Sequence, residues 1–60
     1  MNRQWALIKL RLSKGDVCFE ETIKVFDDET DARAALAEYQ KSASGGYPDW
    51  DEYILQELKP

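Results

Sequence analysis

Few residues of this 60-residue chain could act as a nucleophile. The candidates are Cys18 and three serines, Ser13, Ser42 and Ser44. Activating a thiol or a hydroxyl group requires a neighbouring base or a strongly cationic environment, and the sequence contains no histidine. A domain of this size also leaves little room for a substrate pocket. We therefore expect no enzymatic activity, no catalytic residue and no small-molecule substrate.

The residues that could hold a metal or a cofactor are also sparse. One cysteine without any histidine cannot build the usual zinc site. Acidic residues cluster at 27–31 and 49–52 but lack the spacing of a calcium loop, and the glycines match neither nucleotide-binding pattern. We expect no metal and no cofactor. The acidic clusters are interpreted as helix-capping charges and a solvated loop, with an acidic contact strip for a basic partner as the alternative.

Composition limits the chain to a small folded domain. It has 12 acidic and 8 basic residues, a net charge of −4 and 43% hydrophobic residues, which is typical of a globular protein. Net acidity argues against a general nucleic-acid binder or a membrane-surface binder. The longest apolar run, residues 5–8, is much shorter than a signal-peptide core or a membrane span. We therefore predict one compact domain over residues 1–60 and a cytoplasmic location.

Two alternating segments predict a β-hairpin. Residues 4–13 and 17–26 alternate with period 2 around a turn at Lys14-Gly15. The expected register pairs residue i with residue 29−i. It predicts these pairs: Leu12 with Val17, Leu10 with Phe19, Ala6 with Ile23, Trp5 with Lys24 and Lys9 with Glu20. A turn at Gly15-Asp16 would shift the partners by two and keep the faces, so the register is less fixed than the hairpin.

Glu21 does not fit this pattern. It interrupts an apolar face formed by Val17, Phe19, Ile23 and Val25, where a carboxylate without a partner would be costly. A β-bulge or a position at the sheet margin would let it reach water. The alternative is an inward charge that guards the edge or contacts a partner.

The period changes to that of a helix over residues 29–42. Asp28 or Thr30 can cap its start, and an apolar stripe follows at helical spacing. The stripe consists of Ala32, Ala35, Leu36, Tyr39 and Ala43. Gly45 and Gly46 can adopt the left-handed conformation that often follows a helix.

Residues 47–52 are predicted to form a loop. Residues 53–59 are predicted to form a last strand, and their pattern does not decide which of its two faces points toward the helix. The fold class is therefore α+β, in the order β-β-α-β. The first strand lies centrally in a three-stranded antiparallel sheet of order 2-1-3, with one helix on one face.

One helix can cover only one face of such a sheet. We expect it to cover the side of Ala6, Ile8, Leu10 and Leu12. The uncovered side would hold Trp5, Leu7, Lys9, Arg11, Cys18, Glu20, Thr22 and Lys24, joined by Tyr53 and Leu55 for one facing of the last strand. Aromatic, leucine and arginine side chains in such a patch are typical of protein interfaces. Local packing over Trp5 is the alternative, and strand addition at the exposed sheet margins is a second binding mode.

The chain also resembles a known family. Its segments Trp5-Ala6, Phe19-Glu20, 29–31 and 36–40, with the ending Lys59-Pro60, are similar in order and spacing to the small T7-type phage inhibitors of bacterial RNA polymerase. The resemblance implies a non-enzymatic β-β-α-β domain that binds the jaw region of the polymerase largest subunit. It also implies that Lys59 is a contact residue, whereas Glu57 stands where the family has a second basic residue.

The leading hypothesis is a phage or mobile-element inhibitor that binds a bacterial host protein, such as RNA polymerase, stoichiometrically. Another phage anti-defence protein is an alternative within this class. The candidate partner-binding residues are Trp5, Leu7, Lys9, Arg11, Glu20, Lys24, Tyr53, Leu55 and Lys59. Two other classes of function stay open. One is a nucleic-acid binder that uses Trp5 for stacking, and the other is a homodimer that buries Trp5 and Leu7.

Overall fold

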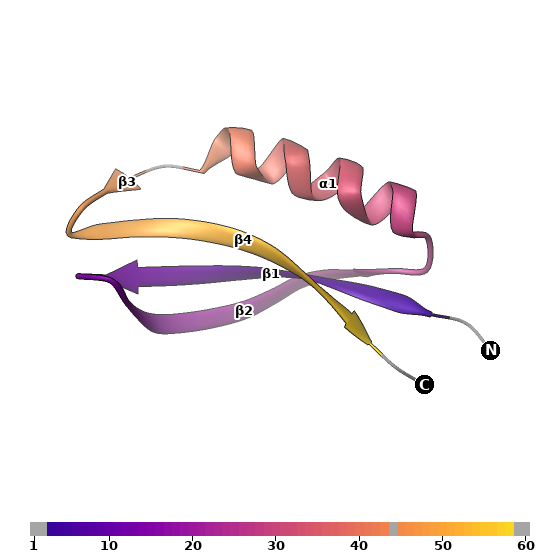
Figure 1. Cartoon of the computed structure of the whole chain (residues 1–60), viewed down its shortest axis with the longest axis horizontal. Helices are drawn as coiled ribbons and strands as arrows, with labels where there is room; N and C mark the ends of the chain where they lie inside the picture. Colours follow the sequence, from indigo (N-terminus) through magenta and orange to yellow (C-terminus); the bar gives the residue numbers. More distant parts are fainter. Residues whose placement is uncertain (1–2, 44, 59–60) are drawn as a thin grey trace.

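The computed structural model, which describes residues 3–43 and 45–58, has one helix over an antiparallel sheet (Figure 1). The elements are β1 (Gln4–Ser13), β2 (Asp16–Phe26), α1 (Glu29–Ser42), β3 (Gly45–Gly46) and β4 (Asp49–Leu58). The sheet order is β2-β1-β4-β3. The predicted α+β class and central first strand are confirmed. The predicted three strands are corrected to four, because Gly45 and Gly46 pair with Trp50 and Asp49.

The predicted loop at residues 47–52 is mostly strand. Only Tyr47 and Pro48, joined by a cis peptide bond, form the turn between β3 and β4. β1 is ten residues long and offers backbone partners as far as Ser13, so β4 continues back to Asp49, which pairs with Ser13. The last strand therefore begins four residues earlier than the sequence pattern predicted.

The β1–β2 hairpin turns where it was expected. Lys14 and Gly15 have φ angles of 54° and 89°, which is typical of the two-residue turn whose twist matches that of the strands. Beyond Leu12–Val17 the register shifts twice, because Cys18 and Ile23 are extra residues on β2. Four expected pairs are therefore wrong. The observed pairs are Leu10 with Glu20, Ala6 with Val25, Trp5 with Phe26 and Lys9 with Glu21.

The two bulges also explain Glu21. It lies on the edge strand β2, between the extra residues Cys18 and Ile23, and its side chain is exposed opposite Lys9. The predicted margin position is confirmed. Each bulge reverses the alternation of β2, so Glu20 and Thr22 lie on the opposite face from the one expected.

Helix α1 covers the predicted residues 29–42. Asp28 caps it, because its carboxylate accepts hydrogen bonds from the backbone amides of Thr30 (2.7 Å) and Asp31 (3.2 Å). The helix gives way to extended backbone at Ala43. Gly45 does have a positive φ of 98°, but it takes this conformation in β3 and not at the helix end.

The helix covers the face that we expected to be uncovered. Leu7 and Ala32 are both fully buried, and the rings of Tyr39 on α1 and Tyr53 on β4 lie 5.2 Å apart. Residues directly opposite each other on paired strands share a face. We call this side the helix face. It comprises Trp5, Leu7, Lys9, Arg11, Phe19, Glu21, Lys24, Phe26, Asp51, Tyr53, Leu55 and Glu57.

Side-chain volume explains this choice of face. The helix stripe is rich in alanine, so the facing sheet must supply bulky groups such as Leu7, Leu55 and Tyr53 to fill the space between the layers. The opposite face offers the small Ala6 near its centre. The resulting core is thin, and its fully or nearly buried residues among those described are Ala6, Leu7, Ile8, Leu12 and Ala32.

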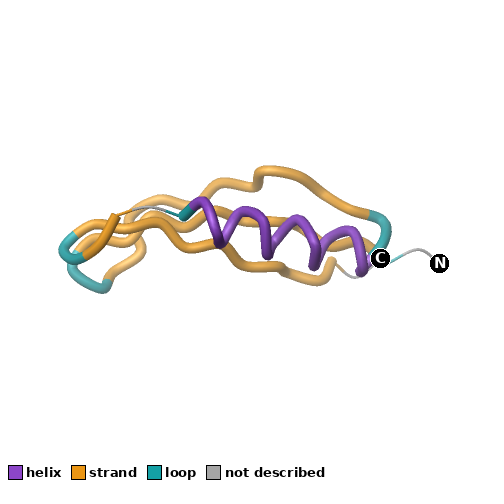
Figure 2. The backbone as a smooth tube through the Cα atoms, turned by 90° about the horizontal axis from the view of Figure 1, so that it is seen from above, coloured by secondary structure: helices purple, strands orange, loops and turns teal. Residues whose placement is uncertain are grey.

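The molecule is flat and elongated, with extents of 41 × 21 × 13 Å. Figure 2 shows the helix running along only part of the sheet, while both hairpin turns extend beyond its C-terminal end. The Cα radius of gyration is 12.4 Å, against about 10 Å for a compact chain of this length. A large share of the side chains is therefore left in contact with water.

Candidate protein-binding surfaces

The structure brings seven of the nine predicted contact residues together, but on the helix face. These residues are Trp5, Leu7, Lys9, Arg11, Lys24, Tyr53 and Leu55. Leu7 is 0% exposed and cannot contact a partner, so its predicted role is wrong. Glu20 lies on the opposite face because of the bulge at Cys18. Lys59 is outside the described residues.

Two basic residues of the helix face, Arg11 and Lys24, have partners within the chain. Arg11 Nε lies 3.5 Å from Asp51 Oδ1, and the side chain of Asp51 is 12% exposed. This contact is an ion pair without a hydrogen bond, because Asp51 Oδ1 has no hydrogen-bond partner. Lys24 Nζ lies 5.1 Å from the centre of the Phe26 ring, within the range of a cation–π contact. These cations are therefore partly committed to the fold.

The other side of the sheet, which we call the free face, carries no layer of the described chain. It is made by rows of directly opposed residues from β2, β1 and β4. The rows are Val17–Leu12–Trp50, Glu20–Leu10–Glu52, Thr22–Ile8–Ile54 and Val25–Ala6–Gln56. On the outer strands of this face three apolar side chains are exposed, namely Val17 (53%), Val25 (42%) and Ile54 (41%). The central-strand residues Ala6, Ile8 and Leu12 of the same face are buried.

The charge on the free face has a single sign. Its charged residues, Glu20 and Glu52, flank Leu10 in one row, and none of the side chains in these rows is basic. Trp50 Nε1 donates a hydrogen bond to Glu52 Oε1 (3.1 Å), which holds the indole beside that carboxylate. The face therefore presents apolar groups with two carboxylates.

Sequence reasoning missed this site. Val17, Val25 and Ile54 were placed with the residues beneath the helix or left without a facing. The alternation of β1 gives two apolar faces, so it could not decide between them. The alanine-rich helix stripe was the available signal, because small residues on one layer require large residues on the other.

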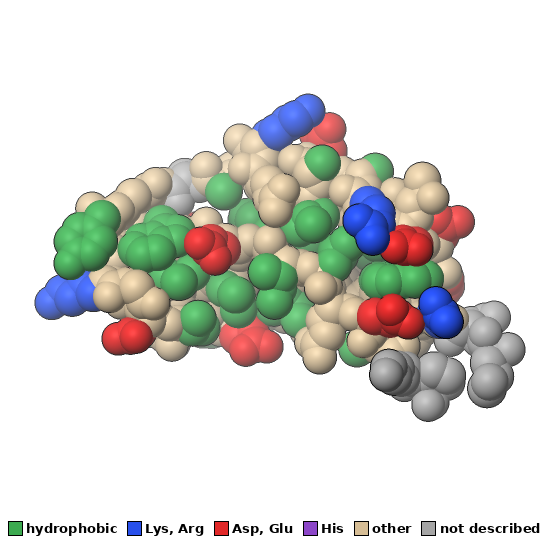
Figure 3. All heavy atoms as spheres, viewed as in Figure 1, with side chains coloured by type: hydrophobic (Ala, Val, Ile, Leu, Met, Phe, Trp, Pro, Cys, Tyr) green, Lys and Arg blue, Asp and Glu red, His purple; other side chains and the backbone are tan. Residues whose placement is uncertain are grey.

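A groove lies between α1 and the outer edge of β4. Its volume is about 470 Å³. The residues that line it are Trp5, Glu29, Arg33, Leu36, Gln40, Tyr53, Ile54, Leu55 and Glu57. Figure 3 shows hydrophobic side chains gathered between the helix and the sheet on this side, with charged groups around them.

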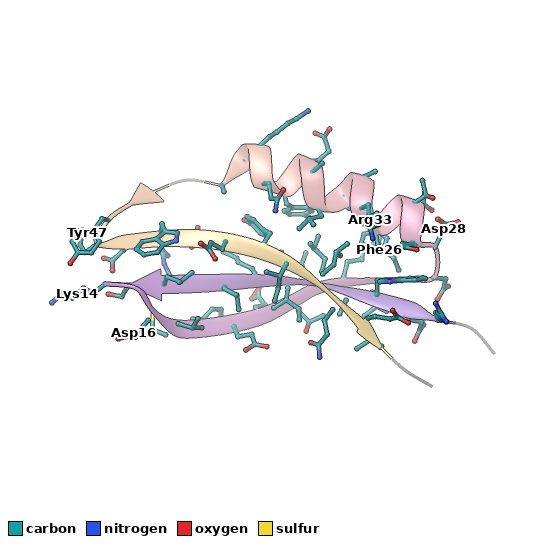
Figure 4. The ribbon with its side chains drawn as sticks, viewed as in Figure 1. Lys14, Asp16, Phe26, Asp28, Arg33 and Tyr47 are labelled. Atoms are coloured by element: carbon teal, nitrogen blue, oxygen red, sulfur yellow. The ribbon has the colours of Figure 1, made fainter. Side chains whose placement is uncertain are left out.

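The rim of the groove is held by ion pairs. Arg33 Nη2 and Glu29 Oε2 lie 2.7 Å apart on successive turns of α1, and Arg33 is on the side of the helix that borders the groove (Figure 4). Arg3 Nε lies 3.5 Å from Glu57 Oε2 on β4. Both pairs are exposed, so each contributes at most about 1 kcal/mol to stability. They shape the rim more than they stabilise the fold.

The two hairpin turns meet at one end of the molecule. The backbone amide of Lys14 donates to the carbonyl oxygen of Pro48 (2.6 Å), and Figure 4 shows Lys14 and Tyr47 close together there. Tyr47 is 80% exposed. A small hollow of about 400 Å³ lies beside it, between Ala43, the β3 glycines and Trp50.

The groups considered for chemistry remain isolated in the structure. Cys18 is exposed, and its Sγ donates a weak hydrogen bond to the carbonyl oxygen of Arg11 (3.4 Å). Within residues 3–43 and 45–58, no three His, Cys, Asp or Glu side chains are grouped to hold a metal ion. Over the same ranges, the structure has no helix with the length and apolarity needed to cross a membrane.

Comparisons of the chain with models of known families, with curated proteins and with solved structures find no match. The resemblance to phage inhibitors of RNA polymerase therefore stays a prediction from the sequence.

Proposed function

We propose that this chain is a non-enzymatic protein-binding module that acts stoichiometrically. The observation that carries the proposal is the free face, where Val17, Val25 and Ile54 expose apolar surface around the carboxylates Glu20 and Glu52. Several exposed apolar side chains on one face of a sheet are typical of a surface that a partner covers. The carboxylates favour a partner with basic groups at the matching positions.

We further propose that the partner is a bacterial host protein, with RNA polymerase as the first candidate. The chain would then be an inhibitor encoded by a phage or a mobile element. This part rests on the resemblance of the sequence segments described above. The contact surface differs from the one first expected, because Leu7 is buried and the helix covers its face.

The nucleic-acid alternative is less favoured by the geometry. A stacking platform needs an accessible aromatic ring beside free cations. Trp5 is half-buried in the α1–β4 groove, and Arg11 and Lys24 on the same face contact Asp51 and Phe26. A homodimer that buries Trp5 and Leu7 is also less favoured, since Leu7 is already covered by its own chain.

Affinity capture from bacterial lysate, read by mass spectrometry, tests the proposal. The informative variant is the double change Val17→Lys and Val25→Lys, which puts two cations on the free face at positions exposed by more than 40% and outside the α1–β4 groove. We expect the wild-type chain to retain a saturable partner and this variant to lose it. Identification of RNA polymerase subunits would support the specific target.

The matched control is the double change Ala34→Lys and Ala37→Lys. Both positions are exposed on α1, so the control adds the same charge away from the free face. Equal capture by both variants would contradict the proposed surface. Capture of no saturable partner at micromolar concentrations would contradict the protein-binding function itself.

A further inference from the structure

We infer that the outer edge of β4 binds an extended peptide with alternating apolar and basic residues as an added strand, and that its side chains enter the α1–β4 groove. Of the residues named for the two sites, only Ile54 belongs to both the groove and the free face. The argument starts from the two edges of the sheet. β2 forms one edge and carries two bulges, a common device against strand pairing. β4 pairs with β3 only at Asp49 and Trp50.

The backbone of β4 determines which groups are available. Ser13 and Asp16 close the two-residue turn at Lys14-Gly15, so they hydrogen-bond to each other across β1 and β2. Orientation alternates along a strand, so Leu12 faces β4 and its partner Trp50 faces β1. By the same alternation, the amides and carbonyls of Asp51, Tyr53, Leu55 and Glu57 point to the outer edge. An array of alternate donors and acceptors is what an added strand satisfies.

The side chains beside this edge specify the chemistry of the peptide. Leu36, Tyr53 and Leu55 line the groove next to the outward backbone groups, so alternate side chains of an added strand would meet apolar surface. β4 carries four carboxylates and no basic residue, and Asp51 and Glu57 pair with Arg11 and Arg3. The exposed Glu52 lies on the side of the strand away from the groove, which favours lysine or arginine between the apolar positions. A second copy paired through the same edge would set carboxylates against carboxylates. The charge therefore favours a different, basic chain.

Amide exchange measured by NMR on the full chain tests the open edge first. In the free protein, the amides of Glu52, Ile54 and Gln56 should be protected by the ladder to β1. Those of Tyr53, Leu55 and Glu57 should exchange at least tenfold faster. Protection of both sets to the same degree would overturn the inference, because the edge would already be occupied.

The binding probe is a blocked octapeptide of alternating lysine and valine. We expect it to slow exchange at Tyr53, Leu55 and Glu57, and to leave the inner amides unchanged. The control peptide replaces two valines by proline at the same net charge, and it should bind at least fivefold more weakly. Equal binding of the two peptides, or no binding of the first at millimolar concentration, would overturn the proposal. So would equal binding of a glutamate–valine octapeptide.

A pair of variants isolates the backbone contribution. Glu57→Pro removes one outward donor and keeps the ladder to β1, whereas Glu57→Ala removes the same carboxylate and keeps the donor. We expect about fivefold or greater weakening with proline and less than twofold with alanine. Equal affinities would contradict strand addition. Dimers of the free chain that Glu57→Pro dissociates would show that the occupant is a second copy and overturn the choice of partner.

Discussion

Leu7 is the residue on which the arrangement of layers depends. Its side chain is fully buried between β1 and α1, together with Ala32. The sequence pattern gave Leu7 and Ile8 equal apolar character on opposite faces, so strand alternation alone could not assign the covered side. Burial of a leucine under a helix has a large energetic consequence in a core this thin.

Truncation of Leu7 should be far more costly than truncation on the free face. Leu7→Ala should lower the free energy of unfolding by about 2–5 kcal/mol, measured by urea denaturation. Val25→Ala, at a site that is 42% exposed, should cost less than about 1 kcal/mol. Similar costs for the two variants would contradict the assigned faces.

Arg11 and Asp51 form the ion pair with the most buried carboxylate among the described pairs. Asp51 is 12% exposed, and its Oδ1 lies 3.5 Å from Arg11 Nε without a hydrogen bond. The sequence could not reveal this pair, because it depends on β4 extending back beyond the predicted strand. Arg11 was predicted to contact a partner, and the structure gives it a role within the fold.

Removal of Arg11 should therefore destabilise the chain. Arg11→Gln leaves a nearly buried carboxylate without its cation and should cost about 1–3 kcal/mol of unfolding free energy. Arg33→Gln breaks the exposed pair with Glu29 and should cost less than about 1 kcal/mol. Chemical denaturation at neutral pH compares them. A larger loss for Arg33→Gln would contradict this assignment.

At the scale of elements, the sequence predicted the features that depend only on residues close together in the chain. The turn at Lys14-Gly15, the Asp28 cap and the helix over residues 29–42 are all found in the structure. The two bulges were not predicted, because β2 contains no glycine to indicate them and Cys18 and Ile23 are ordinary strand residues. Since each bulge reverses the alternation, the bulge at Cys18 changed the face assigned to Glu20, and the bulge at Ile23 restored the expected face from Lys24 onward.

β3 was also missed, because two consecutive glycines after a helix indicate an end and not a strand. Gly45 has a φ of 98°, and a Cβ built on it would lie 2.8 Å from the carbonyl oxygen of Asp49. A Cβ built on Gly46 would have no atom within 4 Å. The two glycines therefore differ sharply in what they tolerate.

Substitution of Gly45 should open the β3–β4 hairpin. Gly45→Ala combines an unfavourable backbone conformation with a backbone clash and should cost about 1–3 kcal/mol. Gly46→Ala should cost less than about 1 kcal/mol. Thermal unfolding, together with the amide exchange of Asp49 and Trp50, gives the comparison. Equal effects would show that the hairpin does not take this geometry.

At the scale of the whole molecule, a single helix cannot cover a four-stranded sheet of this length. The sequence predicted that one face of the sheet would lack a covering helix, but it could not predict which face. The packing of small helix residues against large sheet residues decides that question, and it depends on side chains from three strands at once. The outcome is a flat molecule with the free face on one side and the α1–β4 groove on the other.

The most direct test of this account is a set of methyl–methyl NOEs from the helix to the sheet. The buried methyl group of Ala32 should show strong NOEs to the methyl groups of Leu7 and none to those of Ile8. Val17 and Val25 should show no NOE to any residue of α1. Strong NOEs from Ala32 to Ile8, with Leu7 exposed to a soluble paramagnetic agent, would place the helix on the other face and contradict the account.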